Sequence, residues 1–248
     1  MKRTYKHALV IGASSGIGEE LAVQLARQGA RVAVVARRAE ELERVARRIR
    51  EAGGTVFAHA HDVRSYAEVD PLFDRIVDEL GGLDCAVYAA GVMPRVAEGE
   101  YDFAKDRAML EVNLVGCVAW LNRAALHCEA QRSGTILGVS SIAGERGRRG
   151  APVYCTSKAG MTAYLEALRN RCSRYGVNVV TAKPGFIDTP MTHGMTGLFW
   201  LISAEEAARR ILRLADGRGR SGFVPWRWSL VAFVLKRIPS FLFRKSNI

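Results

Sequence analysis

Short runs of apolar residues alternate along the chain with longer stretches in which apolar positions recur every three or four residues. The short runs are continuous, which is typical of strands buried on both faces of a parallel sheet. The longer stretches have the period of amphipathic helices. The apolar runs cover residues 7–12, 31–37, 55–60, 83–91, 134–141, 176–185 and 222–226, and the helical stretches about 16–28, 39–51, 66–80, 105–131 and 152–175.

This order of elements predicts an α/β protein of the Rossmann type, with a doubly wound, seven-stranded, mainly parallel sheet and helices on both faces. The 248 residues suit one large domain, and no repeat or linker divides them. We therefore expect a single domain over residues 1–225, followed by a basic, aromatic tail of the same domain over 226–248. The loops at 93–103 and about 190–203 are the expected exposed connections.

Composition and charge narrow the class of protein. Apolar residues make up 49% of the chain, which argues against disorder. The five cysteines lack C-x-x-C spacing, so we expect buried, reduced thiols, no metal site and a cytoplasmic protein. We expect no signal peptide at the start of this sequence, because a glycine-rich turn interrupts the first apolar run. The net charge of +11 lies mostly in residues 209–248, which excludes a chain-wide nucleic-acid surface and favours one local anionic contact.

A glycine-rich segment, IGASSGIG at 11–18, follows the first strand and opens a helix. Glycines here let the backbone turn tightly and approach a pyrophosphate, whose charge is stabilised at the helix N-terminus. A plain tight turn is the alternative, but the strand–turn–helix context favours dinucleotide binding. The predicted cofactor contacts in this segment are Gly12, Ser14, Ser15, Gly16, Ile17 and Gly18.

The end of the second strand predicts which dinucleotide is bound. An acid at this point would hold a free ribose 2′-hydroxyl, whereas arginine accommodates a 2′-phosphate. Arg37 and Arg38 stand here, with no acid before Glu40. NADP(H) is therefore favoured, NAD(H) remains an alternative, and a merely basic helix start is a third interpretation. Asp62 and Val63 end the third strand, where the adenine edge is expected.

Tyr154 and Lys158 are four residues apart, hence on one face of a helix. An ordinary tyrosine has a pKa near ~10, too high for acid–base work at neutral pH. A nearby ammonium and an oxidised nicotinamide would favour tyrosinate and lower that pKa. Tyr154 would then protonate a carbonyl oxygen during reduction, and Ser141, at the end of the fifth strand, would hydrogen-bond the same oxygen.

These residues together resemble the short-chain dehydrogenase/reductase family in its compact single-domain form, over about residues 7–226. The matching motifs are Gly12-x-x-x-Gly16-Ile17-Gly18, Asp62-Val63, Asn113 in EVNLVG, Ser141, Tyr154-x-x-x-Lys158 and PGFIDT at 184–189. The resemblance implies a single NAD(P)-binding domain with a built-in catalytic site, and a homo-oligomer.

The resemblance also implies roles for single residues. Asn113 would hold a water relay to Lys158, which also grips the nicotinamide ribose, and Ile187 and Thr189 would contact the carboxamide. The further cofactor contacts that it implies are Ala90, Gly91, Pro184 and Gly185. Two positions depart from the family pattern: Ile11 replaces the usual threonine, and YAAG at 88–91 replaces Asn-Asn-Ala-Gly. We expect the contact between these segments to be apolar.

The loop before Tyr154 carries Arg146, Arg148 and Arg149. Guanidinium groups match phosphate oxygens, so one interpretation is a grip on an anionic substrate. The other is a solvated loop in which Glu145 pairs with an arginine. The tail at 225–248 adds tryptophans and phenylalanines beside lysines and arginines, which suits a membrane interface, although its apolar run is too short to span a bilayer. A subunit contact or a lid on the core is the alternative.

A narrower resemblance is to the decaprenylphosphoryl-2-keto-ribose reductases, carried by SSIAGERGRRG, YCTSKAG, KPGFIDTPM and LKRIPSFLFRKSNI. It implies reduction of a polyprenyl-phosphoryl 2-keto-pentose at the inner face of the cytoplasmic membrane, with a flavin oxidase as pathway partner. Those reductases are described with NADH, against the indication of the two arginines.

Three other functions compete with this hypothesis. The same chemistry would serve a steroid, acyl or other hydrophobic ketone. A non-catalytic dinucleotide sensor is disfavoured because it need not keep Asn113, Ser141, Tyr154 and Lys158 together. A nucleotide-sugar epimerase is disfavoured because little chain remains after residue 190 for a substrate domain.

Overall fold

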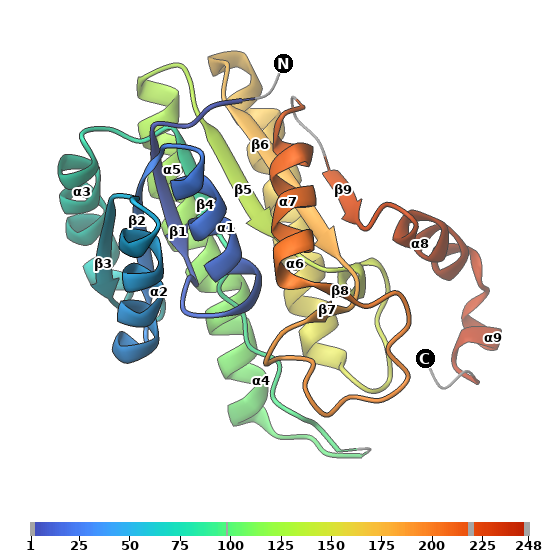
Figure 1. The fold of residues 1–248 in the computed structure, drawn as a ribbon. Helices are drawn as coiled ribbons and strands as arrows, with labels where there is room; N and C mark the ends of the chain where they lie inside the picture. Colours follow the sequence, from blue (N-terminus) through green and yellow to red (C-terminus); the bar gives the residue numbers. More distant parts are fainter. Residues whose placement is uncertain (1–2, 98, 218–220, 246–248) are drawn as a thin grey trace.

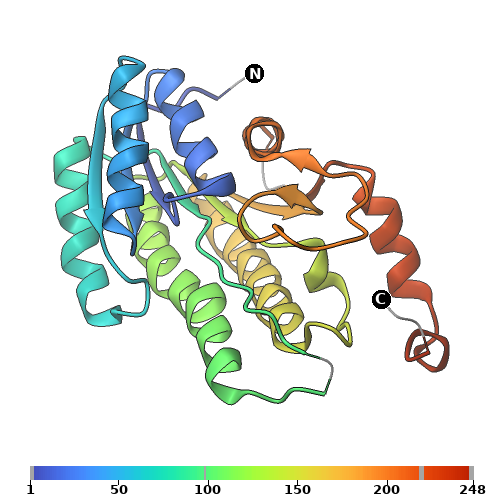
Figure 2. The ribbon, with the colours of Figure 1, turned by 60° about the horizontal axis from the view of Figure 1, so that its bottom comes forward.

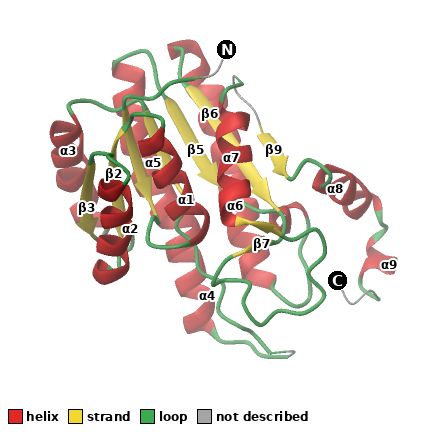
Figure 3. Cartoon of the chain, in the orientation of Figure 1, coloured by secondary structure: helices red, strands yellow, loops and turns green. Residues whose placement is uncertain are grey.

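A computed structural model describes residues 3–97, 99–217 and 221–245. Its centre is a seven-stranded sheet in the order β3-β2-β1-β4-β5-β6-β9, in which every neighbouring pair is parallel (Figures 1 and 3). The strands are β1 His7–Ile11, β2 Arg31–Ala36, β3 Val56–Ala60, β4 Cys85–Tyr88, β5 Thr135–Val139, β6 Asn178–Pro184 and β9 Ser221–Val224. The order reverses direction between β1 and β4, where doubly wound sheets open a ligand crevice.

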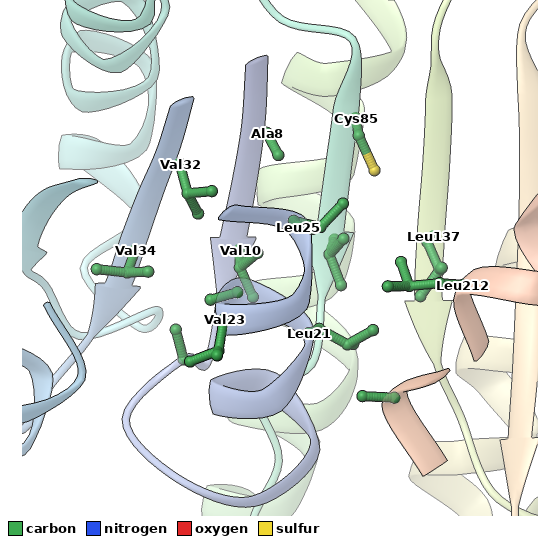
Figure 4. Packing of buried hydrophobic residues seen from close by; sticks show 14 of the residues in the cluster. Ala8, Val10, Leu21, Val23, Leu25, Val32, Val34, Cys85, Leu137 and Leu212 are labelled. Atoms are coloured by element: carbon green, nitrogen blue, oxygen red, sulfur yellow. The ribbon is translucent and has the colours of Figure 1, made fainter. Parts of the chain in front are cut away.

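Two apolar cores lie on the two faces of this sheet. Along β1, Ala8 and Val10 belong to one core and Leu9 and Ile11 to the other, because successive strand side chains point to opposite faces. The first core packs under α1 Gly16–Arg27, α2 Ala39–Glu51 and α7 Ala204–Ala215 (Figure 4). The second packs under α3 Val69–Leu80, α5 Gly116–Ala130 and α6 Pro152–Cys172. The predicted fold class is confirmed.

The long predicted helix over 105–131 is divided. It consists of α4 Phe103–Leu110, a π-helical turn over Glu111–Val115, and α5. The stretch predicted at 66–80 begins with a 3₁₀ turn, Tyr66–Glu68, before α3. A π-helical turn inserts one extra residue into the helix, which changes the direction of the side chains that it carries and is frequent at functional sites.

Helix α7 was not predicted, although the sequence contains a signal for its start. The signal was present: the Ser203 hydroxyl accepts a hydrogen bond from the Glu206 backbone N–H, a cap that the Ser-x-x-Glu spacing encodes. Just before it, Ile202–Ser203 forms β8, which pairs with β7 Ile187–Asp188. The connection at 190–203 is therefore anchored at both ends, because a second, two-stranded sheet closes it.

The tail forms two helices beyond the sheet edge. After β9 the chain enters α8 Trp228–Arg237 and then α9 Ser240–Phe243, which lie outside β9, at the sheet edge opposite β3 (Figures 1 and 2). Within the described ranges, no helix is long and apolar enough to cross a membrane. The five cysteines are buried and carry free thiols.

Candidate active site

The carboxyl ends of the strands open into a cavity of about 750 Å³. Its walls come from the glycine turn after β1, the ends of β2 to β6 and the start of α6. Most of the predicted site residues line it, although they are spread over more than 170 positions of the chain. Lining residues among the predicted contacts are Gly12, Ser14, Ser15, Gly16, Ile17, Gly18, Arg37, Arg38, Asp62, Val63, Ala90, Gly91, Ser141, Arg148, Tyr154, Lys158, Pro184, Gly185, Ile187 and Thr189.

The glycine turn has no room for side chains at two positions. A Cβ at Gly12, where φ is +89°, would lie 2.2 Å from the Ala90 backbone nitrogen, and one at Gly18 would lie 2.2 Å from the Gly12 carbonyl oxygen. This close approach leaves the N-terminus of α1 open toward the cavity, as an anionic ligand requires. The neighbouring Ile11 and Tyr88 face each other in the β1–β4 register and both lie in an apolar core, as expected of that contact.

At the end of β2, the structure distinguishes between the two predicted arginines. Arg38 donates from Nη2 to the hydroxyls of Ser14, at 2.9 Å, and Ser15, at 2.8 Å, so it lies across the glycine turn. Arg37 is 64% exposed and stands 3.8 Å from Asp62. Arg38, and not Arg37, therefore lies next to the glycine turn.

A third cation at this end was not predicted. Arg64 also lines the cavity and hydrogen-bonds Asp62, which lowers the pKa of that carboxyl to about 2. Its only signal in the sequence was its position directly after Asp62-Val63. Asp62 is thus a fixed negative charge held between Arg64 and Arg37.

Asn113 sits in the π-helical turn and is fully buried. Its amide accepts from the Val92 backbone N–H at 2.7 Å and donates to the Val92 carbonyl at 3.0 Å, as a strand partner would. It also donates to the hydroxyl of Ser157, at 3.1 Å, next to Lys158. Asn113 therefore joins the segment after β4 to the catalytic helix from behind the cavity wall, and its role in a water relay stays a prediction.

Lys158 is buried in the cavity wall and donates to the Val139 carbonyl at 3.0 Å. Burial lowers the pKa of its ammonium to about 8, because a charged group loses hydration inside the protein. Its Nζ lies 6.0 Å from the centre of the Tyr154 ring. A Cβ on Gly91 would lie 3.5 Å from both this Nζ and the Asn113 Oδ1, so the three groups border one small space.

The surroundings of Tyr154 raise its pKa, against the expectation from sequence. Burial is the dominant effect, and a hydrogen bond with Ser141 and the charge of Arg148 oppose it. Lys158, from which the lowering was expected, is not among the groups that shift this pKa, and burial outweighs the effects of Ser141 and Arg148 because a buried phenol strongly disfavours ionisation. The positive charge of an oxidised nicotinamide would act in the same direction as that of Arg148.

The arginines of the loop that precedes Tyr154 have different surroundings: Arg148 faces the cavity and Arg146 contacts the tail. Arg148 lines the cavity, and its Nε is buried without a hydrogen-bond partner among the described residues. Arg146 instead donates to the carbonyls of Leu235 and Ile238 and lies 4.0 Å over the Phe243 ring. We therefore correct its predicted role: Arg146 holds the tail, because its guanidinium is committed to the C-terminus of α8.

The structure places the other two charged residues of this loop, Arg149 and Glu145, outside the cavity lining, and the substrate role of Arg149 stays a prediction. Arg149 is exposed and, in the described part of the chain, is not among the cavity-lining residues. Glu145 pairs with lysines instead of an arginine: its carboxylate is 2% exposed and contacts Lys183, at 2.6 Å, and Lys236 of α8. The loop is thus tied on one side to β6 and on the other to the tail.

The substrate end of the cavity has an apolar lining that sequence reasoning missed. Met93 and Pro94 follow β4, and Phe186, Met191 and Met195 follow β6. Methionine side chains are flexible and adapt to irregular apolar ligands. In the sequence, the only indication of a role for Met93, Met191 and Met195 was that they lie in the two loops predicted to be exposed.

A doubly wound sheet whose glycine turn faces a buried Ser–Tyr–Lys group defines a nucleotide-dependent oxidoreductase. The chain belongs to the short-chain dehydrogenase family, whose model matches residues 6–196. This family binds NAD(P) and comprises dehydrogenases and reductases, so the protein is an oxidoreductase of that type.

Similar proteins include an uncharacterized oxidoreductase and two proteins with named activities. An uncharacterized oxidoreductase of Mycobacterium tuberculosis is 32% identical over 238 residues, with 96% of this chain and 95% of that protein covered. The cis-4-hydroxycyclohexanecarboxylate dehydrogenase of Sinomonas cyclohexanicum is 36% identical over 76% of each chain. A variant of the actinorhodin polyketide ketoreductase, solved with NADPH, superposes with a TM-score of 0.82 at 26% identity, covering 92% of this chain and 99% of that one.

Proposed function

We propose that the protein is an NADPH-dependent reductase that converts a ketone to an alcohol. The observation that carries the proposal is the cavity itself, where the Tyr154 phenol meets the Ser141 hydroxyl above the buried amine of Lys158. A catalytically silent dinucleotide sensor would not need a buried lysine, which is costly to maintain.

The residues present fit a dinucleotide. The cradle around Gly12 and Gly18 suits a pyrophosphate, and Arg38, with the Ser14 and Ser15 hydroxyls, offers donors for a ribose 2′-phosphate. This favours NADPH, although the resemblance to keto-ribose reductases would favour NADH. When bound, the dinucleotide supplies the hydride.

The chain's own groups supply the proton and hold the carbonyl. Ser141 donates a hydrogen bond to the substrate oxygen, and Tyr154 transfers its proton to the same oxygen as negative charge develops there. The Tyr154 phenol is protonated at neutral pH, and the charges of Arg148 and of an oxidised nicotinamide would oppose the rise in its pKa that burial causes, so the phenol would become a stronger acid as the hydride is transferred. Lys158, as an ammonium, stabilises the tyrosinate that remains.

The cavity favours a substrate that is apolar and anionic. Met93, Met191 and Met195 offer apolar contacts, and the unpartnered Nε of Arg148 offers a donor to a phosphate or carboxylate. The names of two relatives, a polyketide ketoreductase and a hydroxycyclohexanecarboxylate dehydrogenase, are consistent with a carbonyl on an acidic or acyl substrate. Within this class, we propose a polyprenyl-phosphoryl 2-keto-pentose.

The proposed setting is a cytoplasmic homo-oligomer. It would receive its keto substrate from a flavin-dependent oxidase, because a 2-keto sugar is the product of alcohol oxidation. A neutral steroid or acyl ketone is the competing substrate, and the role of Arg148 separates the two.

The test compares wild type, Tyr154→Phe and Arg148→Gln on a long-chain ketone and on the same ketone as a phosphate ester. Tyr154→Phe should keep NADPH binding and lose about 10²–10⁴-fold in turnover, since the phenol proton is gone and the ring remains. Arg148→Gln should lose activity on the phosphate ester and keep it on the neutral ketone. Near-full activity in Tyr154→Phe would overturn the reductase mechanism, and equal losses of Arg148→Gln on both ketones would overturn the anionic substrate.

A further inference from the structure

The C-terminal helix α8 carries apolar residues on the side that faces away from the protein. Trp228 and Ala232 are buried, and they attach the helix to the body. The outward positions are Leu230, Phe233, Val234 and Arg237. Their i, i+3, i+4, i+7 spacing places them on one helix face. The three apolar members are each more than half exposed, so the outer face of α8 is an exposed apolar surface.

Other exposed apolar residues lie in the segments next to α8. Beyond it, α9 exposes Phe241 and Leu242. Before it, the loop at 190–201 is joined to α8 through aromatic rings: Phe199 stacks on Trp228 with ring centres 4.9 Å apart, and Trp200 meets Trp228 edge-on at 5.6 Å. We call the following set the apolar face: Met195, Phe199, Trp200, Leu201, Leu230, Phe233, Val234, Phe241 and Leu242.

Positive charge surrounds the apolar face, and negative charge is absent from the segment that forms most of it. Residues 225–245 contain five basic residues and no acid. Arg227 lies 4.9 Å over Trp200, and Arg237 lies 3.5 Å over Phe233, so both cations flank exposed rings. Arg244 and Lys245 follow at the exposed end of α9.

We propose that the apolar face docks on an anionic lipid bilayer. Aromatic and aliphatic side chains would enter the headgroup region, and the flanking cations would meet lipid phosphates. Docking is peripheral, since α8 has ten residues and cannot span a bilayer. A symmetric contact with a second copy would bring these cations together without an acid to offset them, which makes a lipid surface the better partner.

The docked tail would be held firmly against the catalytic loop. Glu145 pairs with Lys236 of α8, and Arg146 donates to the Leu235 and Ile238 carbonyls. Both residues belong to the segment between Ser141 and Tyr154. These contacts therefore connect the membrane-facing surface directly to the loop that precedes Tyr154.

The apolar face also reaches the cavity mouth. Met195 belongs to the apolar face and lines the cavity, and Phe186, another lining residue, contacts Phe199 and Trp228. An acyl or prenyl chain could pass from the bilayer to the site along this path without crossing water. Docking itself depends on the surface alone and does not require the proposed reaction.

The test measures binding of the full-length protein to vesicles of phosphatidylcholine mixed with phosphatidylglycerol. Wild type should bind at low ionic strength and should release at high ionic strength or on pure phosphatidylcholine. Arg237→Gln combined with Arg244→Gln should weaken binding about 30-fold, as expected for two cations near an anionic surface. Phe233→Ser combined with Val234→Ser should weaken it about tenfold or more. The tryptophan emission of the wild type should shift to the blue on mixed vesicles, because Trp200 in the apolar face and the neighbouring Trp226 are both exposed.

Matched controls come from the opposite parts of the molecule. Arg47→Gln on α2 and Leu126→Ser on α5 remove one exposed cation and one exposed apolar residue far from the tail, and both should bind as wild type. Equal weakening by these controls, or a wild type that ignores mixed vesicles at low salt, overturns the proposal. Dissociation of an oligomer by the Phe233/Val234 pair, without vesicle binding by the wild type, would assign the apolar face to a subunit contact.

Turnover of a water-soluble ketone is measured in parallel. It should be unchanged in all four variants, which verifies that they fold. A protein that binds vesicles but reduces no ketone would contradict the proposed function and leave the docking proposal standing. The charge pair Arg237→Gln and Arg244→Gln keeps every apolar contact, so the test remains decisive if the serine pair misfolds.

Discussion

Replacing Arg38 with alanine is expected to weaken the use of NADPH much more than that of NADH. Arg38 lies on the hydroxyls of Ser14 and Ser15, at 2.9 and 2.8 Å, where a 2′-phosphate would meet the glycine turn. A hydrogen bond to a charged group contributes about 1.5–3 kcal/mol, and the lower half of that range applies because Arg38 is exposed. The expected loss in kcat/KM for NADPH is therefore about 10- to 40-fold.

The assay follows nicotinamide absorbance with one ketone and both cofactors, at low and moderate ionic strength. Arg37→Ala serves as the matched control, because Arg37 is 64% exposed and only 3.8 Å from Asp62. An exposed pair of this kind contributes about 1 kcal/mol or less, so its loss should stay below about fivefold. The NADH value should change little in either variant. Equal losses for NADPH and NADH in Arg38→Ala, or a wild type that prefers NADH, would refute the assignment of the 2′-phosphate site.

Two further predictions concern stability. Burial lowers the pKa of Lys158 from 10.5 to about 8, so between these pH values the unfolded chain binds more protons than the folded one. The buried charge therefore lowers the free energy of unfolding by its full amount below about pH 8. This destabilisation decreases as the pH rises toward 10.5. Lys158→Met should therefore abolish turnover yet raise the free energy of unfolding by about 2 kcal/mol at pH 7, an advantage that shrinks toward pH 10 in urea titrations; a gap independent of pH would contradict this account. Burial opposes ionisation of Glu145, yet Lys183 and Lys236 lower its pKa, so Glu145→Gln should destabilise the protein by about 3 kcal/mol at pH 7 because it leaves Lys183 without its partner. Glu43→Gln, which removes an exposed pair with Arg50, should cost about 1 kcal/mol or less, and equal effects of the two variants would show that the buried pair is unimportant.

Much of the fold could be predicted from the sequence because its signals are local. Continuous apolar runs mark strands that are buried on both faces, and β1 and β2 begin at the predicted residues, His7 and Arg31. The glycine turn was recognisable because Gly12, Gly16 and Gly18 lie close together between an apolar run and a helical stretch. The Tyr154–Lys158 spacing was informative for a similar reason, since residues four apart on a helix must share a face.

The rest depended on contacts between distant segments. Arg37 and Arg38 are equivalent in sequence, and only the position of Ser14 and Ser15 decides which arginine crosses the glycine turn. The three loop arginines were likewise equivalent until the tail folded back: Arg146 meets carbonyls 89 and 92 residues further along, while Arg148 is left to the cavity. The pKa of Tyr154 is raised because burial has a larger effect on it than the charges nearby. Local periodicity determines which elements form, whereas the direction of a polar side chain and its hydration depend on neighbours that only the packed chain brings within reach.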